Sequence, residues 1–284
     1  MSAPPRRIAF SARDGLRLSA LEWPGDPAAV PLLCLPGIAR TALDFTAIAL
    51  RHRGRRRVVA LDYAGHGESG RAADPARYRV EGAIRDLMDA LAALHLHRVA
   101  LLGTSFGGIL GMALGVLRPG VLAGLALNDT GPRIEPMGIE EVRGFIGRDP
   151  AFASIEEAAA FLRQVLPPLG IPEAGWRAVA ESTYARGPDG RLHPRWDTRI
   201  LQAMPREAGP TELWPLFHSL PEIPLLLIRG EASAILAADT ARRMCEARPE
   251  MEFLALPGIG HAPTLIEPAS LAALDRWLAC LACG

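Results

Sequence analysis

Short apolar runs recur along the chain, and each ends at a residue that favours turns. Six of them, rich in Val, Leu and Ile, cover residues 32–35, 58–61, 99–102, 124–127, 225–228 and 252–256. Apolar runs bounded by Gly, Pro, Asp or Asn are typical of strands buried on both faces of a parallel sheet. Two earlier runs, 8–11 and 16–22, flank Asp14-Gly15, a dipeptide that favours a hairpin. The pattern predicts an α/β fold with an eight-stranded, mostly parallel sheet.

Between the strands, apolar residues at three- and four-residue spacing predict helices. Residues 80–94 place Leu87 and Leu91 on one helical face, and residues 270–281 repeat the pattern with Leu274 and Trp277. We expect the first helix to pack on the sheet and the second to close the fold.

The strand pattern stops between residues 131 and 221. Helical stretches, many prolines and half of the aromatic residues replace it, and Ser154 with Glu157 has the spacing of a capping box ahead of residues 158–166. We expect residues 131–221 to be a helical lid inserted into an α/β core of residues 1–130 and 222–284. An ordinary helical excursion with no contact to any site is the alternative.

Charge and composition exclude several classes of protein. The 31 basic residues balance 31 acidic residues, so no positive field attracts nucleic acid or an anionic membrane. Every basic residue is Arg, which excludes a Schiff-base lysine, a pyridoxal phosphate site and a Walker-type phosphate loop. No run resembles a signal peptide or a membrane span. We expect a cytoplasmic protein that acts on a small molecule, without nucleic acid or membrane partners.

The segment Gly103-Thr104-Ser105-Phe106-Gly107 joins the strand at 99–102 to a helix expected over residues 108–117. A serine hydroxyl is a weak nucleophile until a base removes its proton, and a sharp strand-to-helix turn projects it into a cleft. The flanking glycines leave room for that turn. We predict that Ser105 is a nucleophile and that the N–H of Phe106 donates to an oxyanion.

A second oxyanion donor is expected in the loop after the strand at 32–35. Ligands bind at the carboxyl ends of strands in doubly wound sheets, and Pro36-Gly37-Ile38 follows such an end. The N–H of Ile38 is our candidate. In the alternative interpretation, Pro36-Gly37 simply ends the strand.

Of seven histidines, His261 is the candidate base. It lies in a loop rich in glycine and proline after the last strand, in the chain order serine, acid, histidine. The acid is ambiguous, because Asp129 follows the strand at 124–127 and Glu231 follows the strand at 225–228. We favour Asp129, whose alternative role is a turn residue.

The loop of residues 62–69 is rich in glycine but lacks the pattern of a phosphate cradle or a dinucleotide site. It contains His66, for which we expect a structural hydrogen bond in the turn.

Together, Ser105 with its glycines, residues 62–69, residues 35–38 and residues 258–263 resemble the α/β-hydrolase superfamily over essentially the whole chain. The chain is most similar to a lidded bacterial subgroup of small carboxylesterases, carbon-carbon bond hydrolases of ring-cleavage products and amide hydrolases of ring-opened heterocycles. The resemblance implies a nucleophile at Ser105, a base at His261 and oxyanion donors at Ile38 and Phe106. One departure is Ala234, where similar members carry aspartate. Either the acid has moved to the sixth strand, or the orienting carboxylate is missing.

The sequence therefore predicts a serine hydrolase that cleaves a small carboxylic ester through an acyl-enzyme. Ser105 attacks, His261 is the base, Asp129 is the acid, and neither a metal nor a cofactor is required. The alternatives are a hydrolase of a carbon-carbon or amide bond, and an impaired, ligand-binding homologue that lacks its acid at Ala234.

Overall fold

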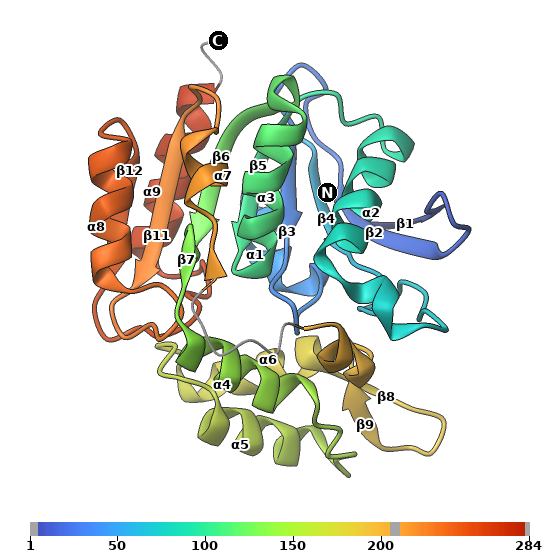
Figure 1. The fold of residues 1–284 in the computed structure, drawn as a ribbon. Coiled ribbons are helices and arrows are strands. Elements are labelled where there is room, and N and C mark those ends of the chain that lie inside the picture. The colour runs from blue at the N-terminus through green and yellow to red at the C-terminus, as the bar shows by residue number, and fades with distance from the viewer. Residues whose placement is uncertain (1–4, 205–210, 282–284) are drawn as a thin grey trace.

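The computed structural model describes residues 5–204 and 211–281. Within these ranges eight strands form one sheet in the order β1-β2-β4-β3-β5-β6-β11-β12 (Figure 1). The strands are β1 (Arg6–Ser11), β2 (Arg17–Trp23), β3 (Leu32–Leu35), β4 (Val58–Asp62), β5 (Val99–Thr104), β6 (Leu122–Asn128), β11 (Leu225–Gly230) and β12 (Glu252–Leu256). The β1–β2 and β2–β4 pairs are antiparallel and the others are parallel. The predicted eight-stranded, mostly parallel sheet is confirmed, and each predicted strand overlaps an observed one.

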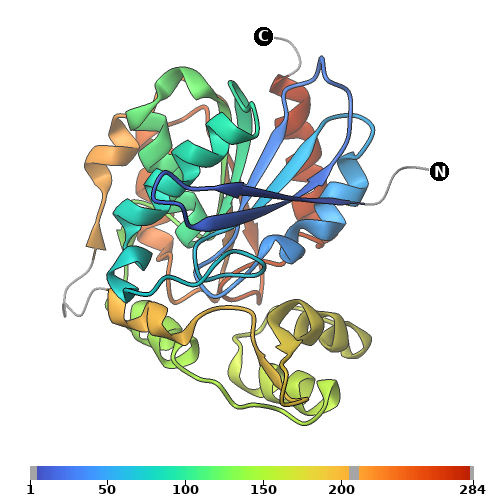
Figure 2. The same ribbon diagram turned by 90° about the vertical axis from the view of Figure 1, so that its right-hand side faces the viewer.

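Side chains of the central strands alternate between two apolar layers, as the pleat of a strand requires. Leu33 and Leu101 lie in one layer, and Leu32 and Leu102 in the other. Helices cover both faces (Figures 1 and 2). The first layer includes residues of α2 (Val80–Ala93), α3 (Phe106–Leu117), α7 (Trp214–His218) and α8 (Ala238–Ala247), and the second includes residues of α1 (Thr46–His52) and α9 (Pro268–Cys280).

The elements from α4 (Pro136–Ile146) to β9 (Leu192–Pro194), which lie between β6 and β11 in the chain, form a separate group beneath the sheet (Figures 1 and 2). The group also contains α5 (Ile155–Val165), α6 (Trp176–Thr183) and β8 (Tyr184–Arg186). It has its own apolar cluster, in which Ala158, Leu162 and Ala180 are fully buried. In the described part of the chain, no helix has the length and apolar character needed to cross a membrane.

Two details of this segment differ from the sequence-based expectation. The segment of residues 131–221 contains short strands that the sequence pattern does not predict: β8 pairs with β9, and β7 (Arg133–Ile134) pairs with β10 (Thr211–Glu212). Strands of two or three residues are too short to show an alternating pattern. The capping box is also shifted: the Ser154 hydroxyl accepts from the N–H of Glu157 at 3.2 Å, but the Glu157 carboxylate accepts from the N–H of Ala153 at 3.0 Å.

Candidate active site

Ser105 lies at the sharp turn between β5 and α3. Its φ of 50° and ψ of −115° are unusual for a residue with a side chain. The turn is held because the N–H of Ser105 donates to the carbonyl oxygen of Asn128 at 3.0 Å. The helix begins at the next residue, Phe106.

Glycines around Ser105 allow this helix to start almost in contact with the sheet. A Cβ at Gly107 would lie 2.1 Å from the carbonyl oxygen of Leu35, and one at Gly108 would lie 2.1 Å from Cγ2 of Thr130. Such distances are far inside van der Waals contact. Close approach of α3 to the ends of β3 and β6 therefore requires glycine at both positions.

The imidazole of His261 lies between a hydroxyl and a carboxylate. Its Nε2 is 2.9 Å from Oγ of Ser105, and its Nδ1 is 2.8 Å from Oδ2 of Asp129. Both distances lie within hydrogen-bond range. With the ring proton on Nδ1, His261 donates to Asp129 and leaves Nε2 free to accept the proton of the Ser105 hydroxyl.

Asp129 is fully buried, and two hydrogen bonds hold it in addition to the one with His261. Its backbone has a φ of 53°, its N–H donates to the carbonyl of Ile228 at 2.7 Å, and its Oδ1 accepts from the N–H of Gly230 at 3.1 Å. Asp is among the few side chains that tolerate positive φ. Of the candidate acids, the structure brings Asp129 to His261, whereas Glu231 is exposed.

Sequence reasoning missed Asn128, which joins the nucleophile turn to the loop of His261. Its side-chain amide donates to the carbonyl of Pro263 at 2.9 Å and to Oγ1 of Thr104 at 3.1 Å. The Pro263 contact spans 135 positions. An Asn at the end of a strand is an ordinary turn signal, so only the spatial neighbours reveal this role.

The two candidate oxyanion donors lie near Ser105. A Cβ built on Gly37 would be 3.7 Å from Cβ of Ser105, so the loop after β3 runs beside the nucleophile turn. Among the described residues, the N–H groups of Ile38 and Phe106 make no hydrogen bond. Phe106 also contributes the positive end of the α3 dipole. Both amides are therefore available to a ligand.

The segment beneath the sheet is hydrogen-bonded to three loops that surround the site. Three bonds make these connections: Arg40 Nη1 to Thr183 Oγ1 at 2.6 Å, Gly67 N–H to Arg195 O at 2.6 Å, and Gly260 N–H to Pro168 O at 2.6 Å. Arg40 also forms a two-pronged ion pair with Asp44 at 2.6 Å. Its guanidinium is therefore engaged in joining protein segments.

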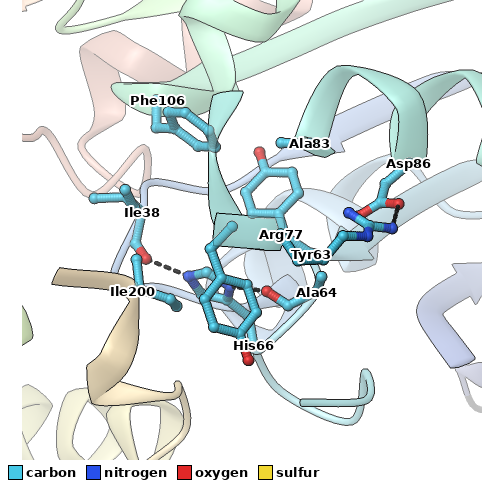
Figure 3. A pocket seen from close by; sticks show the side chains of 10 residues that line it. Ile38, Tyr63, Ala64, His66, Arg77, Ala83, Asp86, Phe106 and Ile200 are labelled. Atoms are coloured by element: carbon cyan, nitrogen blue, oxygen red, sulfur yellow. Dashed lines mark hydrogen bonds and ion pairs between the residues drawn. The ribbon is translucent and has the colours of Figure 1, made fainter. Parts of the chain in front are cut away.

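A cavity of about 270 Å³, including space open to solvent, lies behind the candidate oxyanion loop (Figure 3). Side chains of Ile38, Phe106, Tyr63 and His66 contribute to its lining, whereas Ser105 does not. Among the described residues, no cluster of His, Cys, Asp or Glu could hold a metal ion.

A serine on a sharp strand-to-helix turn, at the edge of a mostly parallel sheet covered by helices on both faces, defines the class of α/β hydrolases. The chain belongs to the alpha/beta hydrolase family, whose model matches residues 32–274. This finding confirms the family resemblance seen in the sequence.

Three relatives or solved structures are similar to this chain over most or nearly all of its length. A 3-hydroxybutyrate-oligomer hydrolase of Cupriavidus necator is 34% identical over 96% of this chain and 97% of its own length. The crystal structure of an alpha/beta hydrolase from Novosphingobium aromaticivorans is 37% identical, with a TM-score of 0.91 over 98% of this chain and 99% of that one. A 2-(acetamidomethylene)succinate hydrolase of Mesorhizobium japonicum is 24% identical over 84% of this chain and 83% of its own length. These relatives indicate a hydrolase and differ in the bond that their names describe.

Proposed function

We propose that the chain is a serine hydrolase that cleaves a small carboxylic ester through an acyl-enzyme. The observation that carries this proposal is the unbroken hydrogen-bonded chain from Ser105 Oγ through the His261 imidazole to the Asp129 carboxylate. Asp129 supplies the carboxylate that is missing at Ala234. The chain of groups therefore favours turnover over a role in binding alone.

In the first half-reaction, His261 Nε2 takes the hydroxyl proton of Ser105 while Oγ attacks the ester carbonyl carbon. The N–H groups of Ile38 and Phe106 stabilise the resulting oxyanion. When the tetrahedral intermediate collapses, the ester C–O bond breaks and His261 gives its proton to the departing alcohol. Asp129 stabilises the imidazolium that forms between these events.

In the second half-reaction, His261 takes a proton from water, and the hydroxide attacks the acyl carbon. The same two N–H groups receive the second oxyanion. Collapse returns the proton to Ser105 and releases the carboxylic acid. Each half-reaction thus uses the same groups with the proton travelling in opposite directions.

Short esters of 3-hydroxy acids are the substrate class that we propose to test first. The Cupriavidus necator relative is named for oligomers of 3-hydroxybutyrate and matches 96% of this chain. We also propose that residues 131–221 are an insertion into a core of residues 1–130 and 222–284, and that its elements from α4 to β9 form a lid, whereas α7 of the insertion packs on the sheet. The insertion's hydrogen bonds to the loops after β3, β4 and β12 support a position above the bound ester.

The test compares three substrates that share a butyryl-sized acyl group: the linear dimer of 3-hydroxybutyrate, 4-nitrophenyl butyrate and 4-nitrobutyranilide. We expect turnover of both esters, little cleavage of the anilide, and a loss of about 10⁴-fold or more in kcat for Ser105→Ala. Ser219→Ala, which alters an exposed serine, is the matched control and should retain full activity. Faster cleavage of the anilide than of the esters would contradict the proposed bond type.

A further inference from the structure

The loop after β4 lies directly behind the candidate oxyanion loop. Its His66 is only 4% exposed. The ring contacts two backbone carbonyls: Nε2 is within hydrogen-bond contact of the carbonyl of Ile38, and Nδ1 lies 3.0 Å from the carbonyl oxygen of Ala64 (Figure 3). One of the two contacted residues thus carries the proposed oxyanion donor.

A second side chain of the same loop reaches the other flank of Gly37. The hydroxyl of Tyr63 donates to the carbonyl of Pro36 at 2.9 Å. The Tyr63 ring also packs edge-on against the ring of Phe106, with 5.5 Å between centroids, and against that of His66, at 5.6 Å. Tyr63 and His66 therefore hold carbonyls on both sides of the Gly37–Ile38 peptide.

That peptide needs external support to keep one orientation. Gly37 has no Cβ, so its backbone has more conformational freedom than that of any other residue. The N–H of Ile38 makes no hydrogen bond within the described ranges, so no bond of its own fixes the orientation of this peptide. Contacts to the flanking carbonyls must supply this orientation.

His66 is itself fixed from the opposite side by the segment beneath the sheet. It forms an antiparallel bridge with Trp196. The N–H of Gly67 donates to Arg195, and the N–H of Asp197 donates to the carbonyl of Gly65 at 2.7 Å. The backbone on both sides of the imidazole is thus hydrogen-bonded to that segment.

The protonation state of His66 limits what the ring can donate. Burial lowers its pKa, against the opposing effect of the two carbonyls and the more distant Asp62 and Asp197. A neutral imidazole has a single N–H, so it can donate to Ile38 or to Ala64 but not to both. The Nε2–H tautomer, the commoner form of free neutral imidazole in histidine, donates to Ile38.

We infer that His66 is a positioning residue for catalysis: its Nε2–H holds the carbonyl of Ile38 and thereby aims the N–H of Ile38 at the oxyanion. This inference rests on the proposed function, because it assigns a task within the same ester hydrolysis. It goes beyond the structural hydrogen bond expected from the sequence.

Two amide substitutions distinguish a residue that positions the carbonyl of Ile38 from one that only stabilises its own turn. In His66→Gln the side-chain N–H₂ reaches the place of Nε2 and can still donate to Ile38. In His66→Asn the shorter side chain reaches only the place of Nδ1 and can donate to Ala64. A residue that merely stabilises its own turn would be replaced better by Asn, whereas a positioning residue would be replaced better by Gln.

With 4-nitrophenyl butyrate, we expect kcat of His66→Asn to fall by about tenfold to a hundredfold, a part of the ~10²–10³-fold cost of losing an oxyanion donor. Its KM should stay within about twofold, because ground-state binding is unchanged. The inhibition constant of butylboronic acid, whose tetrahedral adduct carries an oxygen in the oxyanion position, should rise by the same factor as kcat falls. His66→Gln should restore most of both losses.

The matched control is His52→Asn, which removes another histidine that is 4% exposed but lies on α1. It should lower the melting temperature without changing kcat or the boronic acid inhibition constant. Tyr63→Phe provides a second route, because it removes only the donor to Pro36, and we expect it to lower kcat and weaken the boronic acid in parallel.

Unchanged kcat and boronic acid inhibition in both His66→Asn and Tyr63→Phe would overturn the inference. A loss in His66→Gln as large as that in His66→Asn would also overturn it. The proposed function fails separately, if the wild-type chain does not hydrolyse the ester at all.

Discussion

At the residue scale, the end of β6 supports both unusual backbones of the site. Ser105 and Asp129 have φ values of 50° and 53°. Each such conformation costs on the order of 1–3 kcal/mol and persists only when its surroundings impose it. Asn128 supplies part of that support, because its carbonyl accepts from Ser105 and its side chain holds Pro263. The strain therefore lies where the proposed chemistry needs a fixed geometry.

Replacing Asp129 by Asn tests the acid directly. The amide preserves the shape but can donate to Nδ1 of His261, which selects the wrong tautomer, and we expect kcat to fall by about 10³–10⁴-fold. The matched control is Glu231→Gln, which should leave kcat unchanged. Ester turnover by purified variants measures both, and undiminished turnover in Asp129→Asn would defeat the assignment.

Sequence reasoning reaches some of these residues and not others for a physical reason. The local strand-turn-helix pattern indicates Ser105, and a glycine-rich loop in the expected chain order indicates His261. The choice between Asp129 and Glu231 depends on a positive φ and on the neighbours of β6, neither of which is a local property. The task proposed for His66 depends on a contact across 28 positions.

At the scale of elements, α3 is set unusually close to the sheet. Its first turn lies against the carbonyl of Leu35, so close that position 107 has no room for a side chain. The same closeness aims the helix N-terminus and Ser105 at the edge of the sheet. Packing of this helix and placement of the nucleophile are therefore one requirement.

Two Gly→Ala substitutions in helices should have opposite effects on stability. At Gly107 the added Cβ meets backbone, so we expect a loss of about 1–3 kcal/mol and lower activity. At Gly144, exposed within α4 with no atom within 4 Å of the added Cβ, we expect a gain of about 0.5–1 kcal/mol. Denaturant unfolding measures both, and equal effects at the two positions would contradict the close packing of α3.

The elements that the sequence indicates well are those with a long or continuous pattern. Each predicted strand of the main sheet overlaps an observed one, because four or more apolar residues in a row are a strong signal. The β7–β10 pair joins two-residue strands from distant parts of the chain. Their pairing depends on the arrangement of the helices between them, and no local sequence pattern indicates that arrangement.

At the scale of the whole molecule, the two groups of elements are joined around the site by hydrogen bonds to the loops after β3, β4 and β12. Elsewhere, charged and titratable groups are packed inside the fold. His52 is one of them: it is buried, and its Nε2 lies 3.4 Å from an oxygen of Asp275 and makes no hydrogen bond to any described residue. Such a group makes the stability of the fold depend on pH.

Burial lowers the pKa of His52 to about 4, so the folded state disfavours its charged form. In the unfolded chain the His52 imidazole takes up its proton at a higher pH, near the ordinary pKa of 6.5. The contribution of neutral His52 to the free energy of unfolding is therefore present above pH 6.5 and is lost as the pH falls toward 4. We expect wild type to lose about 2 kcal/mol more unfolding free energy than His52→Leu between pH 7 and pH 5. The control His97→Leu, at an exposed histidine, should follow wild type in denaturant unfolding at both pH values. Parallel pH dependence in wild type and His52→Leu would contradict this prediction.

The proposed reaction depends on His261, which makes the hydroxyl of Ser105 a nucleophile. Labelling with a fluorophosphonate, followed by intact-protein mass and peptide mapping, tests it most directly. We expect one phosphonyl group per chain, attached to the peptide that contains Ser105, with much slower labelling in His261→Gln and none in Ser105→Ala. Folded wild-type protein that stays unlabelled, or that carries the label on another residue, would contradict it.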